Sequence, residues 1–101
     1  MKLIHNSRRS EYRVPFGAVV AGTTVHLTLR VEDADASFLV GEVRTWVDER
    51  GEELIPMALG ENNTLVADIP CPETCILWYS FRVTCTDGSQ LKDVYKRQRV
   101  S

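Results

Sequence analysis

The sequence lacks any long apolar run, and it holds few of the residues that build reactive sites. No window approaches the roughly 18 consecutive apolar residues that a membrane helix needs, so no membrane partner is expected. Residues 1–9 contain too short an apolar run for a signal peptide, which makes the cytoplasm the default location. Three cysteines cannot all pair with one another, and this argues against an oxidising compartment.

An excess of charge of one sign is also missing. The 12 basic and 14 acidic residues give a formal net charge of −2, and the two signs alternate along most of the chain. This pattern gives no reason to expect a nucleic-acid partner. A chain of 101 residues is one domain, with little room for both a core and a deep catalytic cleft. We therefore assign no catalytic residue and expect function on a surface.

Apolar and polar residues alternate with a period of two in several stretches, and no stretch shows helical periodicity. The clearest run, residues 76–85, puts Tyr79 and Phe81 on one face of a strand and Trp78 and Arg82 on the other. Further strands are expected at residues 24–31, 38–48, 54–59 and 64–69, with a short edge strand near residues 16–20. Several short strands separated by turns predict an all-β chain folded as an antiparallel β-sandwich.

Certain positions are expected to interrupt or end these strands. Gly41 predicts a bulge or kink within its strand, and residues 49–52 predict a hairpin turn. Pro56 confines its strand to an edge or a bulge, because proline has no amide hydrogen to donate. Residues 91–101 are basic and nearly devoid of core side chains, so we predict an unstructured tail.

Cys71 and Cys75 flank a proline-rich turn and form at most half of a metal site. A zinc site needs two more ligands at matching spacing. The remaining candidates do not provide them: His5 lies near the N-terminus, His26 is on the outward face of its strand, and Cys85 is on the inward face of a different strand. Free cysteine packs like a small apolar side chain, so we interpret all three as buried or half-buried packing residues. No metal and no cofactor is predicted.

The two tryptophans are the most informative side chains for function. Trp46 and Trp78 both fall on the polar sides of their predicted strands, where indole rings can stack on the apolar faces of sugars. Arg44 and Arg82 lie on the same sides and can donate hydrogen bonds to hydroxyl groups. These four residues are the candidate carbohydrate-binding residues. The alternative is that a neighbouring domain covers these faces, or that a register slip turns one tryptophan into the core.

Several short motifs punctuate the chain: His-Asn-Ser at residues 5–7, Tyr-Arg-Val-Pro-Phe-Gly-Ala-Val at 12–19, Ala-Gly-Thr at 21–23, Leu-Val-Ala-Asp-Ile-Pro at 65–70 and Leu-Trp-Tyr-Ser-Phe-Arg-Val at 77–83. Together they resemble the N-terminal β-sandwich domain of α-amylase superfamily enzymes, the glycoside hydrolase family 13 members of the neopullulanase, cyclomaltodextrinase and pullulanase type. The resemblance covers about residues 4–90. One departure is Cys75, which stands in a turn where that family usually has glycine.

The resemblance implies an immunoglobulin-like accessory domain over residues 1–90. In that family such a domain precedes a catalytic (β/α)₈ barrel, which this sequence does not contain, so none of the barrel's catalytic residues can be placed here. It implies packing against that barrel, binding of an α-glucan such as starch or maltodextrin, and a homodimer in the full-length enzyme. After residue 90 the chain departs from the family pattern, and residues 91–101 resemble a read-through tail on a truncated fragment.

Two other interpretations remain open at this point. The domain can be a structural module for subunit or interdomain assembly that binds no carbohydrate. It can also be a free-standing β-sandwich regulator unrelated to hydrolases. The first alternative predicts that the outward tryptophans contact protein in place of sugar.

Overall fold

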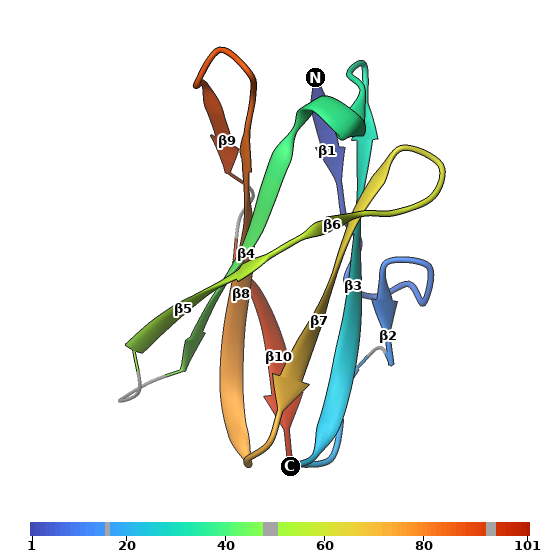
Figure 1. The fold of residues 1–101 in the computed structure, drawn as a ribbon. Coiled ribbons are helices and arrows are strands. Elements are labelled where there is room, and N and C mark those ends of the chain that lie inside the picture. Colours follow the sequence, from blue (N-terminus) through green and yellow to red (C-terminus); the bar gives the residue numbers. More distant parts are fainter. Residues whose placement is uncertain (16, 48–50, 93–94) are drawn as a thin grey trace.

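A computed structural model describes residues 1–15, 17–47, 51–92 and 95–101, and within these ranges the chain forms two antiparallel sheets packed face to face (Figure 1). The predicted all-β fold, an immunoglobulin-like antiparallel β-sandwich, is confirmed. Among the described residues no helix is long and apolar enough to cross a membrane.

The first sheet has the strand order β1-β3-β7-β6, and β2 also pairs with β3. Its strands are β1 (Lys2–Ile4), β2 (Arg13–Val14), β3 (Thr23–Glu32), β6 (Ala58–Leu59) and β7 (Thr64–Cys71). The longest pairing joins β3 to β7, from Thr23 opposite Cys71 to Arg30 opposite Thr64. The apolar side chains at every second position of β3 and β7 therefore face the core from one sheet, as their alternation predicted.

The second sheet has the strand order β10-β8-β4-β5, and β9 also pairs with β8. Its strands are β4 (Val40–Val47), β5 (Gly51–Pro56), β8 (Cys75–Thr84), β9 (Gln90–Lys92) and β10 (Lys96–Val100). A short 3₁₀ turn, η1 (Ala36–Phe38), connects the first sheet to β4. This distribution of strands over two sheets matches the immunoglobulin arrangement.

The core lies between the two sheets and is built by the inward halves of the long strands. Its largest fully buried side chains are Tyr79, Phe81, Leu27 and Leu29, which come from β8 and β3. The predicted inward face of residues 76–85 is therefore correct. Burial of these side chains supplies the main force holding the layers together, at roughly 1.5–3 kcal/mol for each large apolar group.

The segment before β3 closes one side of the sandwich. The His5 ring packs edge-on against Phe81, with 4.8 Å between ring centroids, and Tyr12 is buried beside it. Arg13, 6% exposed, donates from Nη1 to the carbonyl oxygen of Arg97 at 3.0 Å. Three residues of the His-Asn-Ser and Tyr-Arg motifs therefore serve packing rather than ligand binding.

The predicted strand at residues 54–59 is divided in the structure. β5 pairs with β4 in the second sheet and β6 pairs with β7 in the first, so the chain switches sheets at Met57, and Figure 1 shows β5 and β6 as one diagonal segment. Pro56 ends β5 at the sheet edge, as expected. The predicted hairpin is confirmed, because β4 and β5 pair antiparallel with Val47 opposite Gly51. Gly51 and Glu52 belong to β5 and not to the turn, and residues 49 and 50 lie outside the described residues.

Gly41 does not form the predicted bulge. Pairing between β4 and β8 runs without a break from Val40 opposite Thr84 to Val47 opposite Leu77. The reason for glycine is packing: a Cβ atom at position 41 would lie 2.8 Å from Leu65 Cδ1 and 3.1 Å from Met57 Sδ. At residue 41, therefore, the Leu65 side chain of the other sheet packs directly against the backbone of β4.

The predicted unstructured tail at residues 91–101 is wrong for residues 91–92 and 96–100, which lie in strands. Residues 93 and 94 lie outside the described ranges. β9 includes residues 91 and 92, and β10 pairs with β8 from Lys96 opposite Tyr79 to Val100 opposite Cys75. Gln98 and Val100 are each 2% exposed. The backbone of β10 pairs with the free edge of β8 and with Val19. The composition of residues 91–101 does not indicate either partner.

The predicted edge strand near residues 16–20 is reduced to a single bridge. Val19 pairs in parallel with Val100, and the Val19 amide donates to the Arg99 carbonyl oxygen at 3.0 Å. Phe16 lies outside the described residues. The N-terminal segment is therefore tied to both sheets, through β1 and β2 on one side and Val19 on the other.

Candidate functional site

The four candidate carbohydrate-binding residues lie on one face of one sheet. Arg44 and Trp46 point outward from β4, and Trp78 and Arg82 point outward from β8, because their neighbours in sequence are the buried residues of those strands. We call the outward side of β4 and β8 the platform face. The sequence predicted the outward orientation strand by strand, and the structure adds that both strands belong to the same sheet and lie side by side.

The register places the two tryptophans directly opposite each other. Trp46 of β4 is the register partner of Trp78 of β8, and Arg44 is the partner of Ser80. Trp46 is 43% exposed, whereas Trp78 is half-buried. Directly paired residues on adjacent antiparallel strands have Cβ atoms about 5 Å apart, so the two indole groups lie next to each other on this face.

Both arginines of the platform face are held by carboxylates. Arg82 Nη2 lies 2.9 Å from Glu42 Oε1 across the β8–β4 pair, and Arg44 Nη2 donates to Glu52 Oε2 on β5. The hydrogen bond with Glu52 raises the pKa of Arg44 above its ordinary value, and the same bond lowers the pKa of Glu52. Each guanidinium group therefore has a fixed orientation before any ligand arrives.

The chemistry that this face offers is stacking combined with hydrogen bonding. Two adjacent indole rings provide an apolar area, and the Arg44–Glu52 and Arg82–Glu42 pairs provide both donors and acceptors beside it. The face is a flat sheet surface, which desolvates one side of a ligand only.

Sequence reasoning missed three residues of this face. Glu42 and Glu52 were not singled out, because the register that places them beside the arginines depends on how β4, β5 and β8 pair. Tyr95, assigned to the tail, contacts the ring of Trp46 edge-on with 6.3 Å between centroids. Alternation in the strand containing Glu42 could have placed its carboxylate on the outward side, but nothing in the sequence indicated its partner.

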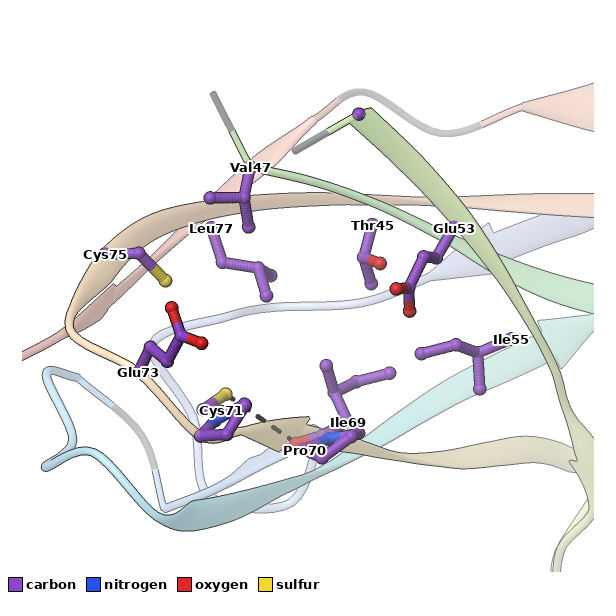
Figure 2. A pocket seen from close by; sticks show the side chains of 12 residues that line it. Thr45, Val47, Glu53, Ile55, Ile69, Pro70, Cys71, Glu73, Cys75 and Leu77 are labelled. Atoms are coloured by element: carbon purple, nitrogen blue, oxygen red, sulfur yellow. Dashed lines mark hydrogen bonds between the residues drawn. The ribbon is translucent and has the colours of Figure 1, made fainter. Parts of the chain in front are cut away.

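A cavity of about 220 Å³ lies at one end of the sandwich, between β5 and the turn that connects β7 to β8 (Figure 2). Apolar side chains from both sheets form its walls, among them Val47, Ile55, Ile69 and Leu77. Its polar lining includes Thr45, Glu53, Glu73, Cys71 and Cys75. In Figure 2 the side chains of Cys71, Glu73 and Cys75 all extend toward this space.

The cysteines differ in their surroundings. Cys71 is buried, and its thiol lies 3.7 Å from the Ile69 carbonyl oxygen. Burial raises the pKa of the Cys71 thiol, and the nearby Cys75 raises it further. Cys75 and Cys85 are half-buried at opposite ends of β8. Within the described residues no group of three or more histidine, cysteine, aspartate or glutamate side chains is arranged to hold a metal ion.

A second, more open hollow of about 480 Å³ lies on the outward face of β3 and β7. It is lined by polar side chains, including His26, Thr28, Arg30 and Glu61. His26 Nδ1 lies 2.7 Å from Asp68 Oδ1 across the β3–β7 pair, and both side chains are well exposed. This outward face carries no tryptophan, unlike the platform face.

Comparison with known proteins identifies no family. No protein-family model matches the sequence. No curated protein matches it either. Any relationship must therefore be sought in the fold.

Solved structures do share the fold. The cycloalternan-degrading enzyme from Trueperella pyogenes has a TM-score of 0.72 at 16% identity, over 95% of this chain and 14% of that chain. The same enzyme in complex with cycloalternan gives 0.72 at 12% identity, over 95% and 17%. Its complex with isomaltose gives 0.70 at 16% identity, over 95% and 14%.

These values show the same fold as one small part of a longer carbohydrate-active enzyme. Nearly all of this chain superposes, yet it spans less than one fifth of the length of the chains that it matches. At such low identity the likeness concerns the fold alone.

Proposed function

We propose that this chain is a non-catalytic domain of a larger glycoside hydrolase, and that its platform face binds an α-glucan such as starch or maltodextrin. The observation that carries the proposal is the direct pairing of Trp46 with Trp78 on the outward side of β4 and β8. Exposed apolar areas on a small domain are typical of sites that contact a ligand or a partner. Paired arginines and carboxylates beside them supply the hydrogen bonds that sugar hydroxyls need.

Two further observations support this proposal. The solved structures of similar fold belong to an enzyme that degrades cycloalternan, and the matched region is a small part of its chain. The motifs at residues 5–7, 12–19 and 77–83 resemble the N-terminal domains of α-amylase superfamily enzymes. In this proposal the catalytic (β/α)₈ barrel belongs to the rest of the parent protein, which also forms a homodimer.

The experiment is affinity electrophoresis of the 101-residue chain in native gels with and without glycogen. We expect glycogen to retard the wild-type chain, with modest affinity because a flat surface covers only one side of the glucan. Trp46→Ala and Trp78→Ala should each remove most of the retardation. Phe38→Ala is the matched control, because Phe38 is an exposed aromatic residue outside the strands of the platform face. Equal mobility of the wild-type chain with and without glycogen would exclude carbohydrate binding by this face.

A second candidate function is assembly without carbohydrate. Phe38, the last residue of η1, and Val40, the first residue of β4, are 68% and 63% exposed and lie two positions apart in the sequence. Exposed apolar side chains that lie together on a small domain are typical of protein contacts. This candidate predicts that the isolated chain self-associates and is poorly soluble, and that Phe38→Ser improves its solubility while glycogen has no effect. Sedimentation as a monomer at all concentrations would count against it.

A further inference from the structure

The cavity between β5 and the β7–β8 turn brings together two thiols that the proposed function does not use. Cys71 is the last residue of β7 and Cys75 the first residue of β8, so the two residues flank a turn of three residues. The chain reverses direction at this turn (Figure 1), and both side chains line the same space of about 220 Å³ (Figure 2). The third cysteine, Cys85, follows the other end of β8, about 33 Å along the strand from Cys75.

The two thiols have complementary exposure. Cys75 is half-buried, whereas Cys71 is 2% exposed, and both line the same space. A disulfide reagent can therefore meet Cys75 first. Once Cys75 carries a mixed disulfide, Cys71 is the thiol held nearest to it, because Cys85 lies at the far end of the strand.

We propose that Cys75 is a site of reversible thiol modification and that Cys71 resolves the adduct into an intramolecular disulfide. The reactant is a small-molecule disulfide, RSSR. The Cys75 thiolate attacks one sulfur of RSSR, forms Cys75–S–S–R and releases RS⁻. The Cys71 thiolate then attacks Cys75 Sγ, forms the Cys71–Cys75 disulfide and releases the second RS⁻. Two protein thiols are oxidised, one RSSR is reduced to two RSH, and the two thiol protons pass to the two leaving thiolates.

The charges around the cavity set the chemical class of the reagent. Glu53 of β5 and Glu73 of the turn both line it, and the structure places no lysine or arginine side chain among its described lining residues. A cationic disulfide such as cystamine is therefore attracted to the cavity, and an anionic one such as oxidised glutathione is repelled. Electrostatic attraction of this kind changes association rates by about tenfold or more, and salt weakens it.

The test uses the 101-residue chain treated with cystamine under native conditions, followed by intact-mass and peptide mass spectrometry. We expect a transient cysteamine adduct on Cys75 that converts to a product lacking two hydrogen atoms, with Cys71 and Cys75 joined. Any adduct on Cys85 should persist, because no thiol lies near enough to displace it, and Cys85→Ser should not change the conversion. In Cys71→Ala the adduct on Cys75 should persist as well, while circular dichroism confirms that this variant is folded.

A second measurement compares the rates at which a cationic and an anionic disulfide modify Cys75, and it does not require the Cys71 variant. Cystamine should modify Cys75 on the order of tenfold faster than oxidised glutathione at low salt, and the ratio should fall at high salt and in Glu73→Gln. The proposal is overturned if the Cys75 adduct in the wild-type chain is as persistent as the Cys85 adduct. It is also overturned if oxidation joins Cys85 to either of the other two cysteines, or if the two reagents react at equal rates at low salt.

Discussion

His5 Nε2 lies 2.9 Å from the hydroxyl oxygen of Tyr79, although the two residues are 74 positions apart in the sequence. His5 Nδ1 lies 2.9 Å from the Thr28 carbonyl oxygen, so Nδ1 carries the proton and donates to that carbonyl. In the neutral ring Nε2 then accepts from the tyrosine hydroxyl. A residue from the N-terminal segment is thereby bonded to β3 of one sheet and β8 of the other.

This relationship predicts that Tyr79→Phe destabilises the fold. Tyr79 is 1% exposed, so Tyr79→Phe removes a hydroxyl group that is shielded from water together with its hydrogen bond to His5 Nε2. Loss of a typical intramolecular hydrogen bond lowers the free energy of unfolding by about 0.5–1.5 kcal/mol. Urea denaturation followed by tryptophan fluorescence measures this cost. Tyr95→Phe, at an exposed position, is the control and should change the midpoint little.

A second prediction concerns the core that holds the two sheets together. Leu27 is fully buried on β3, and Leu27→Ala should lower the free energy of unfolding by about 2–5 kcal/mol because it leaves a cavity between the sheets. The matched control is Leu54→Ala on β5, where the side chain is 45% exposed. Equal destabilisation by the two substitutions, measured by thermal unfolding, would show that Leu27 is not in the core.

A third prediction follows from the close approach at Gly41. Gly41→Ala should destabilise the chain by about 1–3 kcal/mol, because its Cβ atom would overlap Leu65 Cδ1 and crowd Met57 Sδ. The double variant Gly41→Ala with Met57→Ala should recover little, since Leu65 makes the shorter contact. Thermal unfolding of both variants measures this. A stabilised Gly41→Ala variant would mean that the two sheets are farther apart at this point.

A fourth prediction concerns pH and the Arg44–Glu52 pair. The hydrogen bond from Arg44 lowers the pKa of Glu52 in the folded chain below its ordinary value of 4.5. The pair therefore contributes stability above the ordinary pKa and loses it as the pH falls through the lowered value. Glu52→Gln should be less stable than wild type at pH 7, and this difference should shrink below about pH 4.5.

The control for the fourth prediction is Glu53→Gln, which changes the net charge equally and leaves the pair intact. Urea denaturation across a pH series measures both variants. The effect is small, because the pair is exposed to solvent. A difference that grows as the pH falls would contradict the assigned direction of the pKa shift.

The sequence predicted the long strands because their alternation is local information. In β3 the buried residues Val25, Leu27, Leu29 and Val31 alternate with polar residues, and in β8 every second residue from Leu77 to Val83 is apolar and buried, so period-two spacing predicts both the strand and its buried face. The same reasoning placed Arg44, Trp46, Trp78 and Arg82 outward. It could not pair them, because the register of β4 against β8 depends on contacts between distant parts of the chain.

The features that the sequence did not predict also depend on contacts between distant parts of the chain. β10 forms because β8 presents a free edge, and strands can complete an edge even when their own side chains are basic. The sheet switch at Met57 depends on where β7 lies relative to β4. Asn63, immediately before β7, donates from Nδ2 to the carbonyl oxygens of Val31 and Ala34, both at 2.8 Å. Each of these features requires knowledge of a partner far along the chain.

The most direct measurement of the central claim is a titration of the chain with a maltooligosaccharide, followed by NMR of its indole N–H groups. The sequence has two tryptophans, so the spectrum has two such signals, and Trp46 and Trp78 are assigned from the Trp46→Phe and Trp78→Phe variants. We expect both signals to shift together and to saturate with one dissociation constant, because the two rings are direct register partners on one face. Two signals that stay unmoved at millimolar sugar, in a chain that is folded, would contradict it.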